Sequence, residues 1–324
     1  MVLVATALAS ACGSGSNDGP GSDRLVIATT VSPITNIVVN IVGDQADVAG
    51  IVPEGTNSHT FEPAPQVAEL LSQADIVFVN GLKLEDPTLE LAQANIKTTG
   101  EIVEIGTKIL PEKDWIYDFS FPESGGKPNP HLWTNPLYVV KYAELVRDTV
   151  VRRDPQNAAA YNRNFENYRT QLVALTTALR QDSKSLPQQS RMLLTYHDAY
   201  AYFARDFDWT VIGALQPKNF EDPTASEVAR LIDQVRRNKV KVIFGSEVFP
   251  SKVLEEIGRA TGARYEASLR DDDLPGVPGD ADHSLVGLLR YDFRTMIAGL
   301  GGTTAALDAL DVGNTGVDKA TYPQ

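Results

Sequence analysis

The sequence predicts an α/β fold of two lobes, each with a mainly parallel sheet flanked by helices, joined by one long rigid helix. Three observations support this prediction. Short β-branched runs alternate with amphipathic segments, which is typical of parallel sheets covered by helices. The alternation occurs twice, and a long segment without Gly or Pro separates the two occurrences. The length of 324 residues is sufficient for two such lobes.

Residues 24–153 are expected to form the N-terminal lobe. Four short runs rich in Val and Ile predict its strands, and these lie at residues 25–29, 46–52, 75–79 and 101–105. Apolar residues with helical spacing predict helices over residues 33–42 and 65–72, between the strands. This alternation places the strands in one mainly parallel sheet.

Residues 154–186 are predicted to form the connecting helix, because neither Gly nor Pro occurs in residues 156–186. Asp154 is a favourable N-cap residue, and Pro155 suits the first helical position. Spacings of four and three residues place the larger apolar side chains on one buried face. These side chains are Tyr161, Phe165, Tyr168, Leu172, Leu175 and Leu179. A helix of about 45 Å is a stiff link, so we expect small tilts between the lobes and not wide closure.

Residues 187–310 are expected to form the C-terminal lobe, and residues 311–324 a C-terminal tail. Apolar and β-branched runs predict four strands, at residues 191–195, 210–214, 240–244 and 263–266. Helical patterns between these strands predict helices over residues 225–237 and 251–261. A further helix over residues 284–300 follows the last strand, so the second lobe repeats the architecture of the first.

The charge of the chain excludes one class of partner. The formal net charge is −13 at pH 7, and the sequence pI is about 4.8. A nucleic-acid-binding surface needs an excess of Lys and Arg to replace the counterions of phosphate, so we expect no nucleic-acid partner. A net negative charge of this size mainly affects solubility. We also expect the protein to be a monomer.

Residues 1–23 are typical of a signal segment followed by a flexible tether. A short apolar run leads to Cys12, and a stretch rich in Gly and Ser follows it. Cys12 is the only cysteine, which excludes an internal disulfide and a structural thiolate metal site. It resembles the acylated cysteine of a bacterial lipoprotein, which implies a lipid anchor at the extracytoplasmic face of the cell membrane. The alternative is a free cysteine in a flexible tail.

Three of the four histidines, His59, His131 and His197, lie in short polar stretches after apolar runs. Imidazole is the commonest protein ligand of transition metals, so these side chains are candidates for binding one ion. They are far apart in the sequence, and only the tertiary fold can bring them together. His59 and His197 follow the carboxyl ends of predicted strands, where open α/β sheets bind ligands. A single histidine is more often a polar core or loop residue, so the prediction depends on all three.

Motifs around these histidines resemble one protein family. They are Pro53 followed by His59-Thr60-Phe61-Glu62-Pro63, Asn129-Pro130-His131-Leu132-Trp133, and His197-Asp198-Ala199-Tyr200 with Tyr202-Phe203. The pattern is similar to that of the metal-binding solute receptors of bacterial ABC importers for zinc and manganese, over residues 24–300. The resemblance implies that His59 and His131 from the N-terminal lobe bind a divalent metal together with His197 and one carboxylate from the C-terminal lobe. It also implies delivery of the metal to an ABC permease.

The resemblance places the carboxylate ligand among three consecutive aspartates, Asp271, Asp272 and Asp273. Asp272 is the best match to the family pattern, and the other two are alternatives. Without the resemblance, this stretch would be interpreted as a solvated acidic turn. Glu247 follows a predicted strand in a context that is also similar to the family. We expect it to line or support the site, with direct ligation as a minor alternative.

The expected metal is Zn²⁺, with Mn²⁺ and Fe²⁺ as alternatives, and it is a transported ligand. Three imidazoles and one carboxylate suit tetrahedral zinc. Manganese receptors of the family often carry a carboxylate at the position of His197, so a histidine there favours zinc. A carboxylate that binds through both oxygens would suit manganese or iron. Because protons compete for imidazole, affinity is expected to fall as the pH decreases toward about 5.

Two other functions are compatible with these residues. A zinc-dependent hydrolase would keep one metal position open for water and would need a general base, such as Asp198 or Glu247. A metal-independent adhesin or structural lipoprotein would not use the histidines. The sequence contains no HExxH motif, nucleophile elbow or phosphate-binding glycine loop, and we predict that the protein is not an enzyme.

The fourth histidine, His283, precedes the helix predicted over residues 284–300. We interpret it as an exposed residue near the N-terminal end of that helix and not as a metal ligand. The predicted site therefore uses three histidines and one aspartate.

Overall fold

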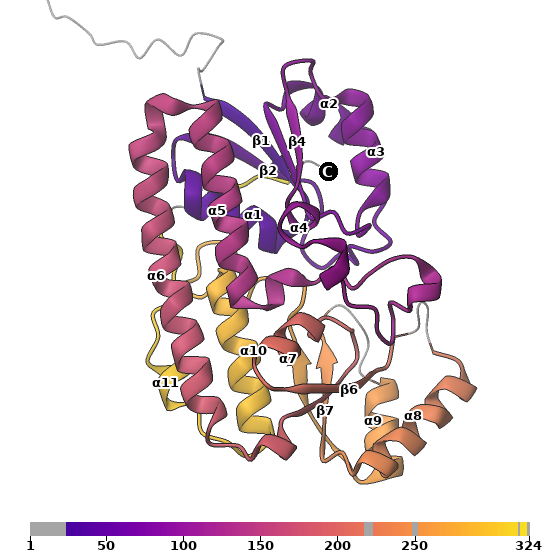
Figure 1. Ribbon diagram of the computed structural model, residues 1–324. Coiled ribbons are helices and arrows are strands. Elements are labelled where there is room, and N and C mark those ends of the chain that lie inside the picture. The colour runs from indigo at the N-terminus through magenta and orange to yellow at the C-terminus, as the bar shows by residue number, and fades with distance from the viewer. Residues whose placement is uncertain (1–23, 217–222, 248–251, 317, 323–324) are drawn as a thin grey trace, which may run out of the picture.

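The computed structural model describes residues 24–216, 223–247, 252–316 and 318–322. Cys12 and the predicted signal segment lie outside the described residues. Two four-stranded parallel sheets form the centres of an upper and a lower lobe, and one long helix runs beside both (Figure 1). This arrangement confirms the predicted fold class.

The sheet of the N-terminal lobe has the strand order β2-β1-β3-β4, and all its pairs are parallel. Its strands are β1 (Leu25–Thr29), β2 (Ala46–Gly50), β3 (Ile76–Val79) and β4 (Glu101–Glu104). The helices of this lobe are α1 (Ser32–Val42), α2 (Gln66–Gln73), α3 (Asp86–Asn95) and α4 (Ile105–Ile109). Every residue of β3 is buried, as expected for a parallel strand covered on both faces.

The sheet of the C-terminal lobe repeats this topology in the order β6-β5-β7-β8, again with parallel pairs. Its strands are β5 (Met192–Thr195), β6 (Thr210–Ala214), β7 (Val242–Ser246) and β8 (Arg264–Leu269). Its helices are α7 (Ala201–Asp206), α8 (Ala225–Asn238), α9 (Lys252–Thr261), α10 (Leu285–Gly299) and α11 (Ala305–Asp308). In both lobes the carboxyl ends of the strands supply the loops that meet between the lobes.

Two long antiparallel helices, α5 (Pro136–Arg153) and α6 (Ala158–Ser183), form the side of the molecule in Figure 1. The predicted start of the connecting helix is wrong, because a 3₁₀ turn at Pro155–Asn157 precedes α6. The Asp154 carboxylate does not cap a backbone N–H, since Oδ2 instead accepts from Asn157 Nδ2 and Tyr161 Oη. The predicted apolar stripe of α6 is buried.

The segment that we predicted as a C-terminal tail returns to the N-terminal lobe. Gly50 N–H donates to Thr321 O over 2.8 Å, and Thr321 N–H donates to Val48 O over 3.2 Å, so the segment extends the edge of β2. The Asn314 carboxamide oxygen accepts from Asn40 Nδ2 of α1 over 2.9 Å. The end of the chain therefore connects the two lobes for a second time.

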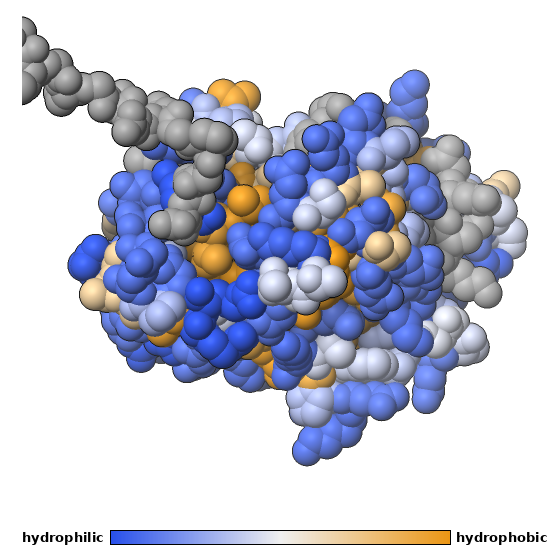
Figure 2. Space-filling view, turned by 90° about the horizontal axis from the view of Figure 1, so that it is seen from above, coloured by the Kyte–Doolittle hydropathy of each residue, from blue (hydrophilic) through white to orange (hydrophobic). Residues whose placement is uncertain are grey.

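The upper face of the molecule is mostly hydrophilic, with an apolar area near its centre (Figure 2). This agrees with the strongly acidic composition. Within the ranges described above, no helix combines the length and apolar character that a membrane-spanning segment requires.

Candidate metal centre

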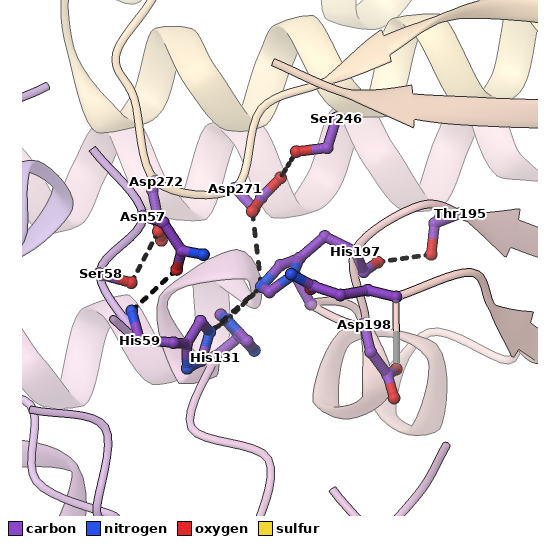
Figure 3. A network of polar contacts seen from close by, with 12 residues as sticks. Asn57, Ser58, His59, His131, Thr195, His197, Asp198, Ser246, Asp271 and Asp272 are labelled. Carbon is purple, nitrogen blue, oxygen red and sulfur yellow. Dashed lines mark hydrogen bonds and ion pairs between the residues drawn. The ribbon is translucent and has the colours of Figure 1, made fainter. Parts of the chain in front are cut away.

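The fold brings the three predicted histidines together between the lobes (Figure 3). His59 lies on the loop between β2 and α2, His131 lies just before the 3₁₀ turn Leu132–Thr134, and His197 follows β5. The Nε2 atom of His59 is 3.2 Å from that of His131 and 3.3 Å from that of His197, and the latter two are 2.8 Å apart. Nitrogen ligands of a tetrahedral zinc ion lie about 3.3 Å from one another. The triangle therefore has nearly the size that a metal ion requires.

The hydrogen bonds on the outer side of His131 and His197 fix their tautomers. His131 Nδ1 lies 2.9 Å from the carboxamide oxygen of Asn129, and His197 Nδ1 contacts the carboxamide oxygen of Gln216. Because an amide oxygen only accepts, each Nδ1 carries the hydrogen. The two neutral rings therefore direct Nε2 lone pairs toward the same point. Acceptors on the outer side of a histidine are typical of metal ligands, because they orient the ring and increase its basicity.

Burial keeps all three imidazoles neutral at physiological pH. It lowers the pKa of His197 to about 4 and the pKa values of His59 and His131 well below the usual range. A second cause for His59 and His131 is the proximity of the other imidazoles. Neutral rings can donate their lone pairs to a metal without first losing a proton.

Asp271, and not Asp272, is the aspartate whose carboxylate lies within ion-pair distance of one of these histidines, His197. Asp271 Oδ2 lies 3.5 Å from His197 Nε2, and Oδ1 accepts a hydrogen bond of 3.0 Å from Ser246 Oγ (Figure 3). Oδ2 is buried and accepts no hydrogen bond from the described part of the chain. Asp272 was the better match by sequence, but its Oδ2 accepts from Ser58 Oγ over 2.7 Å.

Glu247 supports the acidic turn, which consists of Asp271, Asp272 and Asp273. Its Oε1 accepts from the backbone N–H groups of Asp271, Asp272 and Asp273 over 2.9, 3.1 and 3.1 Å. These are the contacts of a supporting residue. Burial, followed by the nearby Glu247 charge, raises the pKa of Asp271 well above its usual range, and burial also raises the pKa values of Asp272 to about 7 and Asp273 to about 6. A cation would offset this concentration of negative charge.

The backbone of the acidic turn is fastened to the N-terminal lobe. Trp133 Nε1 donates to Asp271 O over 2.6 Å, and Ser32 Oγ donates to Asp272 O over 2.6 Å. Both donors are buried. The Asp271 side chain is thus positioned by residues of both lobes.

Asp198, which was a candidate general base, points away from the histidines (Figure 3). Its Oδ2 accepts from Ser120 N–H over 2.9 Å. It lies beside Asp118, whose pKa is raised to about 9 by burial and by the Asp198 charge. Asp198 therefore joins the lobes and does not face the candidate metal position.

Three residues of the site were not predicted from the sequence. Asn129 and Gln216 orient the histidines, and the Phe121 ring lies 5.5 Å from the His59 ring and 5.6 Å from the His131 ring. A cavity of about 100 Å³ opens beside His59 and Phe121. The Asn-Pro-His motif could have indicated Asn129, whereas Gln216 and Phe121 carry no local signal.

The prediction that His283 is exposed is wrong. Its residue exposure is 3%, and its Nδ1 lies 3.0 Å from Pro275 O. The loop that precedes α10 folds back over the ring, which the sequence pattern does not reveal. His283 does not belong to the group formed by His59, His131 and His197.

Fold and site together define a two-lobed binding protein with a candidate metal centre between its lobes. The sequence model of the ZnuA family, described as zinc-uptake complex component A, periplasmic, matches residues 27–299. The chain belongs to this family, which confirms the resemblance inferred from the motifs. The family consists of substrate-binding proteins of ABC importers and not of enzymes.

Individual relatives extend over nearly the whole chain. The iron-binding protein YfeA of Yersinia pestis is 28% identical and covers 93% of this chain and 94% of its own length. The manganese-binding lipoprotein MntA of Halalkalibacterium halodurans is 27% identical, with coverage of 93% and 97%. The manganese-bound periplasmic metal-binding protein of Candidatus Liberibacter asiaticus is 26% identical, covers 86% of this chain and all of its own, and has a TM-score of 0.76. The periplasmic zinc-binding protein TroA of Treponema pallidum, 23% identical over 86% of this chain and 99% of its own, shares the fold with a TM-score of 0.77.

Proposed function

We propose that this protein is the extracytoplasmic receptor of an ABC importer, which captures a divalent transition metal between its lobes and delivers it to the permease. The observation that carries this proposal is the pair of tautomers fixed by Asn129 and Gln216. With these tautomers, the Nε2 lone pairs of His131 and His197 face each other over 2.8 Å and repel. A cation bound between them would relieve the repulsion. Family membership supports the same function.

The proposed ligands are His59, His131, His197 and Asp271. We propose Asp271 in place of Asp272 because, of the two, only the Asp271 carboxylate lies within ion-pair distance of a histidine, at 3.5 Å from His197 Nε2. Ser246 occupies the other oxygen of Asp271, which favours binding through one oxygen and hence four-coordinate Zn²⁺. The names of the relatives also include manganese and iron, so Mn²⁺ and Fe²⁺ are the competing ions.

We also propose that a lipid on Cys12 anchors the protein to the cell membrane and that the receptor is a monomer. The names of several relatives include the word lipoprotein. A tether that starts at Cys12 would leave both lobes outside the membrane and the acidic surface in contact with water.

A receptor explains the site better than a hydrolase. A catalytic zinc needs an open position for water and a base beside it. Asp271 is the proposed fourth ligand and lies 3.5 Å from His197 Nε2, Asp198 points away, and Glu247 Oε1 already accepts three N–H groups. A metal-independent structural role would leave the buried carboxylates of the acidic turn without a function.

Thermal unfolding with and without metal tests the proposal. Metal-free protein is titrated with Zn²⁺, Mn²⁺ or Fe²⁺ under anaerobic conditions, and the His131→Ala variant serves as the comparison. Free Zn²⁺ at a thousandfold excess over its dissociation constant should stabilise the wild type by about 4 kcal/mol and should have little effect on the variant. An unchanged wild-type melting temperature with all three ions would contradict the proposed function.

A further inference from the structure

The histidine outside the metal centre is buried at the boundary between the lobes. The His283 side chain is 4% exposed and lies directly before Ser284, the N-cap residue of α10. Nδ1 lies 3.0 Å from Pro275 O, which can only accept, so Nδ1 carries a hydrogen. Nε2 faces the N-terminal lobe and lies 3.7 Å from Glu54 Oε1.

Glu54 has a polar atom that needs this partner. Its Oε1 is buried and receives no hydrogen bond from the residues for which the structure gives positions. Burial raises the pKa of Glu54, and His283 is the main opposing influence. A buried carboxylate oxygen without a partner destabilises the folded state. His283 Nε2 faces this oxygen at 3.7 Å, so the two groups form an ion-pair contact across the lobe boundary.

Glu54 belongs to the loop that carries His59. This loop is fastened to the C-terminal lobe at two further points, where Gly55 N–H donates to Asp273 Oδ2 and Ser58 Oγ donates to Asp272 Oδ2, each over 2.7 Å. Both points lie on the acidic turn that also carries Asp271. The contact between Glu54 and His283 differs from these two, because it connects the loop to the start of α10.

We propose that His283 is a positioning residue for metal capture, which pairs with Glu54 and thereby holds the His59 loop against the C-terminal lobe. The proposal rests on the proposed function. His283 does not touch the metal, and it acts through Glu54 on the placement of His59. Loss of the pair should therefore allow the loop to open more often and the bound metal to leave faster.

Other charged groups around Glu54 determine the effect of pH. Asp273 and Asp318 are acidic, Arg270 is basic, and Tyr322 is a neutral phenol. When Glu54 loses its proton at higher pH, it becomes an anion beside the carboxylates of Asp273 and Asp318. The anion can no longer donate a proton toward Nε2, so the contribution of the pair to metal retention should decrease as the pH rises.

Variants of both partners test the pair through the rate of Zn²⁺ release to an excess of chromogenic chelator. His283→Asn retains an N–H for Pro275 O but does not reach Glu54, and Glu54→Ala removes the other partner. Each single variant should release Zn²⁺ roughly three to ten times faster than wild type at pH 6. The double variant should be no faster than either single variant. Effects that multiply in the double variant, or single variants that equal wild type, would refute the proposal.

Glu54→Gln separates pairing from a merely structural role. Its side-chain amide can accept or donate a hydrogen bond at Nε2, so its advantage over Glu54→Ala should be the same near pH 6 and pH 8.5. Wild type should lose its advantage over Glu54→Ala at the higher pH, whereas Glu54→Gln should keep it. An identical pH profile for all these proteins would contradict the pairing. If wild type binds no Zn²⁺ at all, the proposed function fails and not this inference alone.

Discussion

His131 and His197 show how residues outside the coordination sphere prepare a metal site. Each donates its Nδ1 hydrogen to a side-chain amide, so each presents Nε2 as a lone pair. Without a cation, the two lone pairs lie 2.8 Å apart in a buried environment. The residues that fix the tautomers are therefore expected to contribute to binding through the rings that they orient.

Replacement of Gln216 by Ala should weaken Zn²⁺ binding by about 10- to 100-fold, because His197 loses the acceptor that fixes its tautomer and orientation. Competition with a chelator of known affinity measures this change. The matched control is Gln188→Ala, which alters an exposed residue of the same type far from the site and should bind as wild type. Equal affinity of the Gln216→Ala variant and wild type would show that the outer hydrogen bond is dispensable.

Asp271→Asn should weaken Zn²⁺ binding by about 100-fold or more, and Asp272→Asn by less than about tenfold. Asp271→Asn should also stabilise the metal-free protein at pH 8. Because the pKa of Asp271 is raised in the folded state, ionisation of this carboxyl at high pH destabilises the fold. The asparagine side chain does not ionise, so the variant avoids this loss of stability. Chelator competition and urea unfolding measure the two effects. A larger loss of affinity in Asp272→Asn would restore the sequence-based assignment.

At the scale of elements, apolar runs predicted the strands well, and the central strands β3 and β7 are buried at every residue. The start of β7 was predicted two residues too early. Lys239 adopts a left-handed φ of 54°, and Val240 N–H donates to Val235 O, so these residues close α8. Helix α5 was not predicted, although Asn135 before Pro136 forms an N-cap and accepts from Leu137 N–H. Its paired valines are compatible with either a helix or a strand.

The candidate site was predictable only in part, for a physical reason. The three histidines are rare and lie in distinctive motifs, so the sequence identifies them. The three aspartates are identical and consecutive, and only the turn held by Glu247 determines which side chain faces inward. The burial of His283 depends on the path of the preceding loop, which no local pattern specifies.

Leu172 on α6 tests whether this helix belongs to a core shared by both lobes. It is fully buried, and α6 contacts α1 and α5 of the N-terminal lobe as well as α10 and α11. Leu172→Ala should destabilise the protein by about 2 to 4 kcal/mol in urea unfolding while leaving a single transition. Val173→Ala, at a neighbouring position that is 51% exposed, should change stability by less than about 0.5 kcal/mol. Two separate transitions would show that the lobes unfold independently.

At the scale of the whole molecule, the lobes are joined near the metal centre by the acidic turn and at the side by α6. The C-terminal segment adds a further link through Thr321 and Asn314. Several connections of this kind agree with the expectation of small tilts between lobes. Metal binding should therefore tighten an existing interface and not close a wide cleft.

Zn²⁺ binding should release close to one proton near pH 7. The imidazoles are already neutral, with the pKa of His197 at about 4, whereas burial raises the pKa of Asp271, so its carboxyl competes for protons at a higher pH than an ordinary aspartate. Affinity should therefore decrease as the pH falls from about 8 to 6, through proton competition at the carboxylate and not at the imidazoles. Calorimetry in buffers of different ionisation enthalpy measures the proton release. No release near pH 7, with release confined to pH values near 4, would identify the imidazoles as the competing groups.

The central claim is that one ion binds to three histidines and Asp271 between the lobes. The most direct measurement is the crystal structure of the zinc-loaded protein, with anomalous scattering recorded on both sides of the zinc absorption edge. We predict one anomalous peak about 2.0 to 2.2 Å from the Nε2 atoms of His59, His131 and His197 and from one oxygen of Asp271. A zinc peak elsewhere, or a peak at the histidines with Asp272 as its carboxylate ligand, would contradict this account.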